Sequence, residues 1–228
     1  GTAITDYVVQ YSTDNSTWTT FSDTVSTTAS VTVTGLTNYS TYYFRVAAIN
    51  AVGTGVYSSP SVTSVPGVSP GAPTLSIGTI GNTQVALSWT ASAATAASIT
   101  DWTVQFSTNN STWTTFSDGV STTTSATVTG LTNGTLYYFR VAGINPAATG
   151  TYSASSSATP RTVPDAPIIT TLTPGNTQVV VSWSAPATGG SAITDYDLEY
   201  SSNSGSTWTA WASGTTSTAT SVTVTGLT

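Results

Sequence analysis

A long internal repeat limits how this chain can fold more than any other feature. The segment "ITDYVVQYSTDNSTWTTFSD" begins at Ile4 and returns at Ile99 as "ITDWTVQFSTNNSTWTTFSD", an offset of 99 − 4 = 95 residues. A third copy, "ITDYDLEYSSNSGSTWTAW", begins at Ile193 and has a slightly longer turn. Because self-similarity at a fixed period is typical of tandem arrays, the sequence predicts a series of near-identical units.

The composition describes a folded chain with a nearly uncharged surface. Charged residues make up 5% of the sequence, against about 25% in ordinary soluble domains. Roughly two residues in five are Ser or Thr, yet hydrophobic residues reach 38% and aromatic residues 10%, which is too many for a disordered stalk. The net charge of -6 opposes binding to phosphate backbones and anionic lipid, so we expect no nucleic-acid partner. No apolar run approaches the ~18 residues of a membrane span.

Short strands separated by turns account for each unit. The stretches "TQVALSW", "DWTVQF" and "LYYFRVAGI" alternate apolar and polar residues at period two, and no stretch has helical periodicity. The Pro-rich segments "VPGVSPGAP" and "TPRTVPDAP" mark boundaries between units. About seven strands in ~95 residues indicate an all-β fold of tandem immunoglobulin-like β-sandwiches. We expect a partial unit at residues 1–65 without its first two strands, a complete unit at 66–160, and a partial unit at 161–228 without its last two strands.

The order of motifs in each unit resembles the fibronectin type III domain. A Pro-rich start is followed by "SW" on the second strand, "ITDY" on the third and "TGLTNGTLYYFRVAGIN" near the end. The resemblance covers essentially the whole chain. The chain is similar in kind to bacterial members of the family that have near-identical repeats. It implies that Trp89 and Trp183 are core residues, and that Leu131 with Tyr137 forms a tyrosine corner, in which the hydroxyl bonds back to the chain. The alternation itself places Tyr137, Phe139 and Val141 on one inward face.

The residue types needed for catalysis are scarce. Cys and His are absent, and the chain has no Lys, so thiolate, imidazole and amine chemistry have no candidates. We therefore expect no enzymatic activity, no cofactor and no metal site. One alternative stays open: Asp195, Asp197 and Glu199 follow at alternate positions, which would place three carboxylates on one strand face and could recruit a hard cation such as calcium.

Seven Trp residues raise the alternative of a sugar-binding platform. Trp18, Trp113 and Trp208 recur beside the same turn in each unit, and recurrence at a fixed place favours packing within the unit. Partial exposure beside a turn would instead favour a platform for sugars.

Runs of Ser and Thr precede the same strand in each unit. They can be ordinary strand-forming sequence or sites for O-linked glycans. If glycans are present, we expect them on these runs, and not mainly on the five Asn-X-Ser/Thr triplets, whose number matches chance in so Ser- and Thr-rich a chain. The candidate sites are Ser121, Thr122, Thr123, Thr124, Ser125, Ser26, Thr27, Thr28 and Ser30.

Uniform units favour a structural role. Only four of the 18 positions from Asp6 to Asp23 differ from the second copy, which indicates a repeated building block. We expect an extracellular or cell-surface filament, sheath, stalk or surface layer that associates with copies of the same protein and carries glycans on the Ser/Thr runs. A spacer array in a secreted polysaccharide-degrading enzyme and a cell-surface adhesin remain alternatives.

The repeat begins and stops in the middle of a unit. Isolated half-units would leave half of a sandwich core in water. We therefore expect this chain to be a section of a longer repeating polypeptide.

Overall fold

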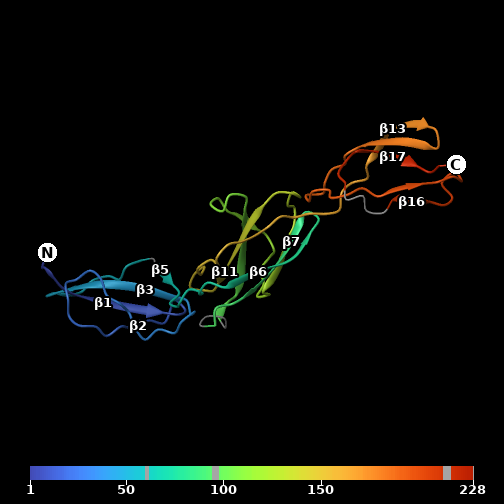
Figure 1. The fold of residues 1–228 in the computed structure, drawn as a ribbon. Coiled ribbons are helices and arrows are strands. Elements are labelled where there is room, and N and C mark those ends of the chain that lie inside the picture. The colour runs from blue at the N-terminus through green and yellow to red at the C-terminus, as the bar shows by residue number, and fades with distance from the viewer. Residues whose placement is uncertain (60–61, 94–97, 213–216, 228) are drawn as a thin grey trace.

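The computed structural model describes residues 1–59, 62–93, 98–212 and 217–227, and every named element in these ranges is a β-strand. Three lobes follow one another along the chain, with the two termini at opposite ends (Figure 1). All strand pairings are antiparallel. The all-β prediction is confirmed.

The middle lobe is a sandwich of seven strands. One sheet has the order β10-β7-β6 and the other has the order β12-β11-β8-β9. The strands are β6 (Thr74–Gly81), β7 (Gln84–Thr90), β8 (Asp101–Ser107), β9 (Thr114–Phe116), β10 (Ser125–Val128), β11 (Tyr137–Ile144) and β12 (Ser156–Ala158).

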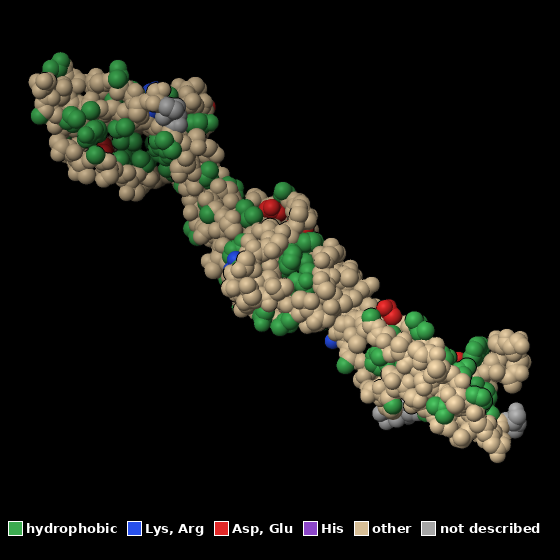
Figure 2. Space-filling model, turned by 90° about the horizontal axis from the view of Figure 1, so that it is seen from above, with side chains coloured by type: hydrophobic (Ala, Val, Ile, Leu, Met, Phe, Trp, Pro, Cys, Tyr) green, Lys and Arg blue, Asp and Glu red, His purple; other side chains and the backbone are tan. Residues whose placement is uncertain are grey.

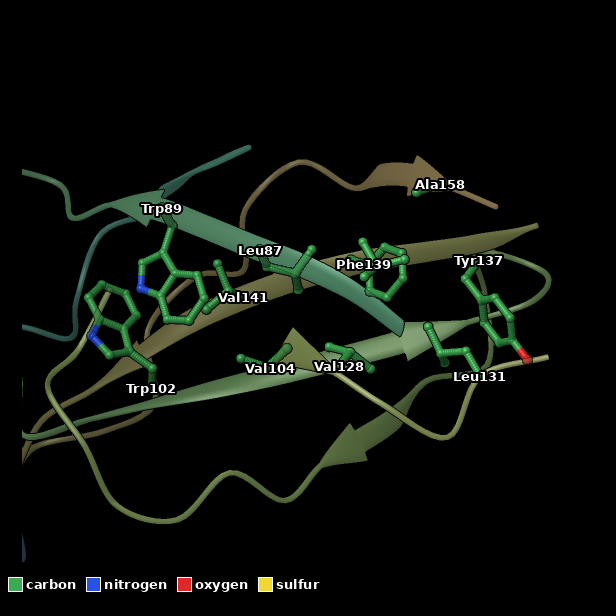
Figure 3. Packing of buried hydrophobic residues seen from close by; sticks show 11 residues of the cluster. Leu87, Trp89, Trp102, Val104, Val128, Leu131, Tyr137, Phe139, Val141 and Ala158 are labelled. Carbon is green, nitrogen blue, oxygen red and sulfur yellow. The ribbon is translucent and has the colours of Figure 1, made fainter. Parts of the chain in front are cut away.

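The core lies between these two sheets. Tyr137, Phe139 and Val141 on β11 are all buried, as their alternation predicts, and Leu131 is buried beside Tyr137. Burying each such side chain contributes about 1.5–3 kcal/mol, which is the main stabilisation available to a sandwich without disulfides. Figure 3 shows this cluster running the length of the sandwich from Trp89 and Trp102 to Tyr137.

Two Trp residues pack against each other at one end of the core. The rings of Trp89 and Trp102 meet edge to face with centroids 5.6 Å apart, and the indole nitrogen of Trp89 faces the Trp102 ring (Figure 3). Within the described residues the buried Nε1 of Trp89 has no hydrogen-bond partner, and it lies beside the Trp102 ring. Trp183 packs edge to face on Tyr196, with centroids 5.2 Å apart, and its buried Nε1 likewise has no hydrogen-bond partner in the described part of the chain.

The tyrosine corner is present twice. The Tyr137 hydroxyl accepts a hydrogen bond from the backbone N–H of Thr132 at 3.2 Å. The Tyr42 hydroxyl accepts one from the N–H of Thr37 at 3.0 Å. In both lobes this bond joins the residue just before a turn to the start of the long strand that follows it.

The first lobe has one sheet of the sandwich. Its order is β2-β1-β3-β4, and β5 pairs with β3. These strands correspond to the β12-β11-β8-β9 sheet of the middle lobe, because the repeat aligns β1 with β8 and β3 with β11. The strands are β1 (Ile4–Ser12), β2 (Thr19–Thr20), β3 (Tyr42–Asn50), β4 (Gly53–Thr54) and β5 (Val62–Ser64).

The last lobe has the other sheet. Its order is β13-β14-β17, matching β6, β7 and β10, and a separate two-stranded sheet is formed by β15 and β16. The strands are β13 (Ile168–Gly175), β14 (Gln178–Ser184), β15 (Leu198–Tyr200), β16 (Thr209–Ala212) and β17 (Ser221–Thr225).

Candidate functional surface

An arginine sandwiched between two aromatic rings lies on the outer face of the middle lobe. The Arg140 guanidinium is 4.1 Å from the ring centroid of Trp113 and 4.1 Å from that of Tyr152. Its Nε and Nη2 both donate to Gln105 Oε1, at 2.9 and 2.7 Å. Because a guanidinium is planar, it can stack on both rings while its edge is held by the amide. We call these four residues the arginine stack.

The first lobe repeats the arginine stack. Arg45 lies 4.0 Å from the Trp18 ring and 4.3 Å from the Tyr57 ring, and it donates to Gln10 at 2.8 and 2.6 Å. The expectation that the recurring Trp residues pack within their units is therefore met at Trp18 and Trp113. In the last lobe the equivalent Trp208 is 61% exposed.

Sequence reasoning missed the arginine stack, although a signal was present. Arg45 and Arg140 are separated by 140 − 45 = 95 residues, and Gln10 and Gln105 by 105 − 10 = 95, the period of the repeat itself. The chain has only three positively charged side chains, so an Arg that recurs at the repeat period indicates a structural partner.

The Ser/Thr runs lie in loops whose side chains reach solvent. In the middle lobe the whole run from Ser121 to Ser125 is exposed, and Ser125 begins β10. In the first lobe Thr27, Thr28 and Ser30 are exposed while Ser26 is half-buried. The structure thus leaves all but one of the candidate glycan sites exposed.

A carboxylate holds each of these loops in place. Asp101 Oδ1 accepts a hydrogen bond from the backbone N–H of Ser121 at 2.9 Å. Asp6 does the same for Ser26 at 3.0 Å, as does Asp195 for Ser217 at 3.2 Å. This explains why Asp recurs in the motif "ITD": it anchors the start of the Ser/Thr loop in each unit.

The strand-face arrangement expected for Asp195, Asp197 and Glu199 is wrong. The strand β15 begins only at Leu198, so Asp195 and Asp197 precede it. The Asp195 carboxylate accepts from the N–H of the next residue, Tyr196, and from that of Ser217 in the Ser/Thr loop. Within the described residues, no group of three or more acidic side chains could hold a metal ion.

The turn after β1 depends on one carboxylate. Asp14 Oδ1 accepts from the Ser12 hydroxyl at 2.8 Å and from the N–H groups of Ser16 and Thr17 at 2.8 and 2.7 Å. These bonds, with that of Thr17 the strongest, hold the pKa of Asp14 well below its usual range. In the middle lobe Asn109 accepts the same three bonds, at 3.0, 3.0 and 2.8 Å, without a titrating group.

We expect acid to loosen the first of these turns and not the second. A lowered pKa means that Asp14 stabilises its turn above the ordinary aspartate pKa of about 3.9, and that this contribution is lost as pH falls toward the folded-state pKa. Amide chemical shifts of Ser16 and Thr17 should move on acidification, while those of Ser111 and Thr112 should stay constant. Equal movement at both turns would show that the carboxylate is not the cause.

A hollow of about 510 Å³ lies on the sheet of the first lobe. Its apolar floor includes Tyr7, Val9 and Val46, and its rim is formed by the Ser/Thr loop from Asp23 to Val31. The repeat aligns Tyr7 with Trp102 and Val9 with Val104, which are core residues in the middle lobe. The hollow thus corresponds to core positions, not to a ligand pocket.

In the part of the chain that the structure describes, no helix is long and apolar enough to cross a membrane.

The comparison with known families decides the assignment that the fold suggests. The sequence model of the fibronectin type III domain matches the chain three times in tandem, at residues 1–64, 69–159 and 165–228. The chain belongs to the fibronectin type III family. The resemblance in the motifs and the seven-stranded topology of the middle lobe agree with this assignment.

Relatives of this fibronectin type III chain include receptor-type tyrosine-protein phosphatase F of several mammals. The mouse protein is 30% identical over 175 residues, which cover 74% of this chain and 9% of the relative. The human protein is 31% identical over 133 residues, covering 58% of this chain and 7% of the relative. The chain therefore spans less than a tenth of the length of these relatives.

Proposed function

We propose that this chain is a structural extracellular array, part of a filament, sheath, stalk or surface layer, that associates with further copies of itself. The observation that carries the proposal is the uniformity of its units. The arginine stack, the Asp anchor of the Ser/Thr loop and the cap of the turn recur with nearly the same distances in the first and middle lobes. Units specialised for different ligands would differ at such outward positions, whereas near-identical units are suited to setting the length of an array.

The relatives support a location outside the cell. Their name describes a receptor, and the matched part of this chain consists of fibronectin type III units. Because the chain spans about 9% of the mouse relative, the phosphatase activity in that name is not transferred to it. We expect the array itself to act as a spacer and scaffold, without catalysis.

The surface supports a glycan-bearing array. Side chains of Asp, Glu and Arg are sparse over the visible face, which is mostly uncharged polar surface (Figure 2). Solubility then depends on hydroxyl groups or on what is attached to them. The loops from Ser121 to Ser125 and from Ser26 to Ser30 present those hydroxyls on a path fixed by Asp101 and Asp6.

Labelling of intact cells of the source organism tests this proposal. An antibody raised against residues 66–160 should label the outer surface without permeabilisation, along filaments or a continuous layer in electron micrographs. Light scattering of the purified chain should give masses that rise with concentration above 23.2 kDa. Intact-mass analysis of native material shows whether glycans are attached to the chain. Labelling that requires permeabilisation would contradict the surface location, and a constant mass of 23.2 kDa would contradict self-association.

A further inference from the structure

Tyr39 has a backbone conformation that bulky residues rarely adopt. Its φ is 65°, in the left-handed region, and the equivalent residue one repeat later (39 + 95 = 134) is Gly134 with a φ of 78°. Glycine adopts this conformation without cost, whereas a Cβ is crowded there. A strained residue persists only where its surroundings hold it, which directs attention to what the Tyr39 side chain contacts.

Those contacts are with the linker to the next unit, residues 65–68, which lie between the first two family matches. The Tyr39 N–H donates to the Pro66 carbonyl at 2.7 Å, and the Tyr39 hydroxyl donates to the Val68 carbonyl at 3.4 Å. The Val68 carbonyl also accepts from the Asn145 side-chain amide of the middle unit at 2.8 Å. One linker carbonyl is thus bound by side chains from both units.

The Tyr39 ring also fills the space beside the linker. A Cβ placed on Gly67 would lie 2.7 Å from Tyr39 Cε1 and 3.1 Å from the Cβ of Ala147, which belongs to a turn of the middle unit. Glycine at position 67 therefore lets the ring and this turn approach the linker from either side.

The second junction uses the same position with a different residue. The Gly134 N–H donates to the Pro160 carbonyl at 2.9 Å, which repeats the bond between Tyr39 and Pro66. Here the turn of the following unit comes close enough that a Cβ on Gly134 would lie 3.3 Å from Gly190 Cα. A Cβ on Gly190 would press on the Gly134 nitrogen and lie 2.9 Å from the Pro160 oxygen. Gly189 accepts from the Thr162 N–H at 2.8 Å, which holds the linker against this turn.

We propose that position 39, with its repeat equivalent 134, is the surface through which each unit docks the unit that follows it. At the first junction the Tyr39 side chain occupies the space beside Gly67 of the linker. At the second junction Gly134 leaves room for Gly190 of the next unit. The pairing fixes the angle at each junction, so that the lobes seen in a row in Figures 1 and 2 form a stiff rod. This inference deepens the proposed function and rests on it for its biological meaning, since a scaffold of fixed length requires rigid junctions.

Distances between spin labels within one chain test the proposal. The protein has no Cys, so label sites can be introduced without background. Thr19, Thr114 and Thr209 are exposed and occupy the same place in the three units. The pair Thr19→Cys with Thr114→Cys reports the first junction, and Thr114→Cys with Thr209→Cys reports the second. Dilution with excess unlabelled chain removes contributions between copies, so self-association does not affect the readout.

The parent chain should give one narrow distance distribution for each pair. Tyr39→Gly relieves backbone strain yet should widen the first distribution roughly twofold or more, because the junction reverts to that of a flexible linker. It should leave the second distribution unchanged. Gly134→Tyr should shift or widen the second distribution alone, since its side chain has no room beside Gly190.

Hydrogen exchange of the β11 backbone checks whether the Gly134→Tyr variant is folded. If Gly134→Tyr does not fold, the Tyr39→Gly variant still decides the test. Broad distributions in the parent chain, or no change at the first junction in Tyr39→Gly, would overturn the proposal. Neither result would bear on whether the array lies at the cell surface, which the labelling of intact cells decides.

Discussion

Replacing Phe139 with Ala should unfold the middle unit under mild denaturing conditions. The Phe139 side chain has no exposed surface and lies at the centre of the sandwich, packed against Tyr137 with ring centroids 6.4 Å apart. Removing a buried phenyl group costs about 3–5 kcal/mol, because the transfer energy is lost and a cavity remains. A small domain has about 5–15 kcal/mol of stability, so this loss is a large part of the total.

Hydrogen exchange of the whole chain followed by mass spectrometry measures this effect unit by unit. Peptides from β7 and β11 should exchange far faster in Phe139→Ala, and peptides from the first lobe should not change. Leu136→Ala is the matched control, since Leu136 lies three residues away and is 46% exposed, and it should cost under about 1 kcal/mol. Equal losses in the two variants would mean that the core is not where the structure places it.

Removing the Arg140 guanidinium should destabilise the middle unit by about 1–2 kcal/mol, the second-largest effect we expect. Arg140→Met keeps the length of the side chain but removes the stacking on Trp113 and Tyr152 and both hydrogen bonds to Gln105. Arg140→Lys should recover little of this loss, because an ammonium neither stacks as a plane nor presents two N–H groups of one rigid plane to the same oxygen.

Chemical denaturation monitored by exchange of the β9 and β11 peptides measures the loss. Arg161→Met is the control, since Arg161 is exposed and its backbone N–H donates to the Gly81 carbonyl, a bond that the substitution keeps. Both variants change the net charge equally, so any shared effect is electrostatic. If Arg161→Met were as destabilising as Arg140→Met, the stack would contribute nothing beyond its charge.

The core and the fold class were predictable because their cause is local in the sequence. The alternation around Tyr137, Phe139 and Val141 is set by the geometry of a single strand, in which every second side chain faces the same way. At the equivalent positions of the first lobe Tyr42 is buried, whereas Val46 is 39% exposed, because that lobe has only one sheet of the sandwich. The order of the motifs was sufficient to indicate the fibronectin type III family, which the three tandem matches show.

The outer surface was less predictable, because its contacts depend on how strands and loops meet. Gln105 and Arg140 are 35 residues apart and become neighbours only through the register that pairs β8 with β11. The three carboxylates from Asp195 to Glu199 were expected on one strand, since the sequence pattern does not show that Asp195 bonds to a loop 22 residues further on.

By itself, then, the sequence determined the repeat, the all-β class, the inward face of β11 and the absence of Cys and His from this chain, all of which follow from composition and period. Only the tertiary structure decided that the recurring Arg is held between two rings and that the "ITD" aspartate anchors a loop. It also decided that Tyr39 bonds to the linker and that Gly134 lies against Gly190 of the next unit. These are contacts between distant segments, and their geometry is fixed by strand register and turn conformation, which no local pattern of residues specifies.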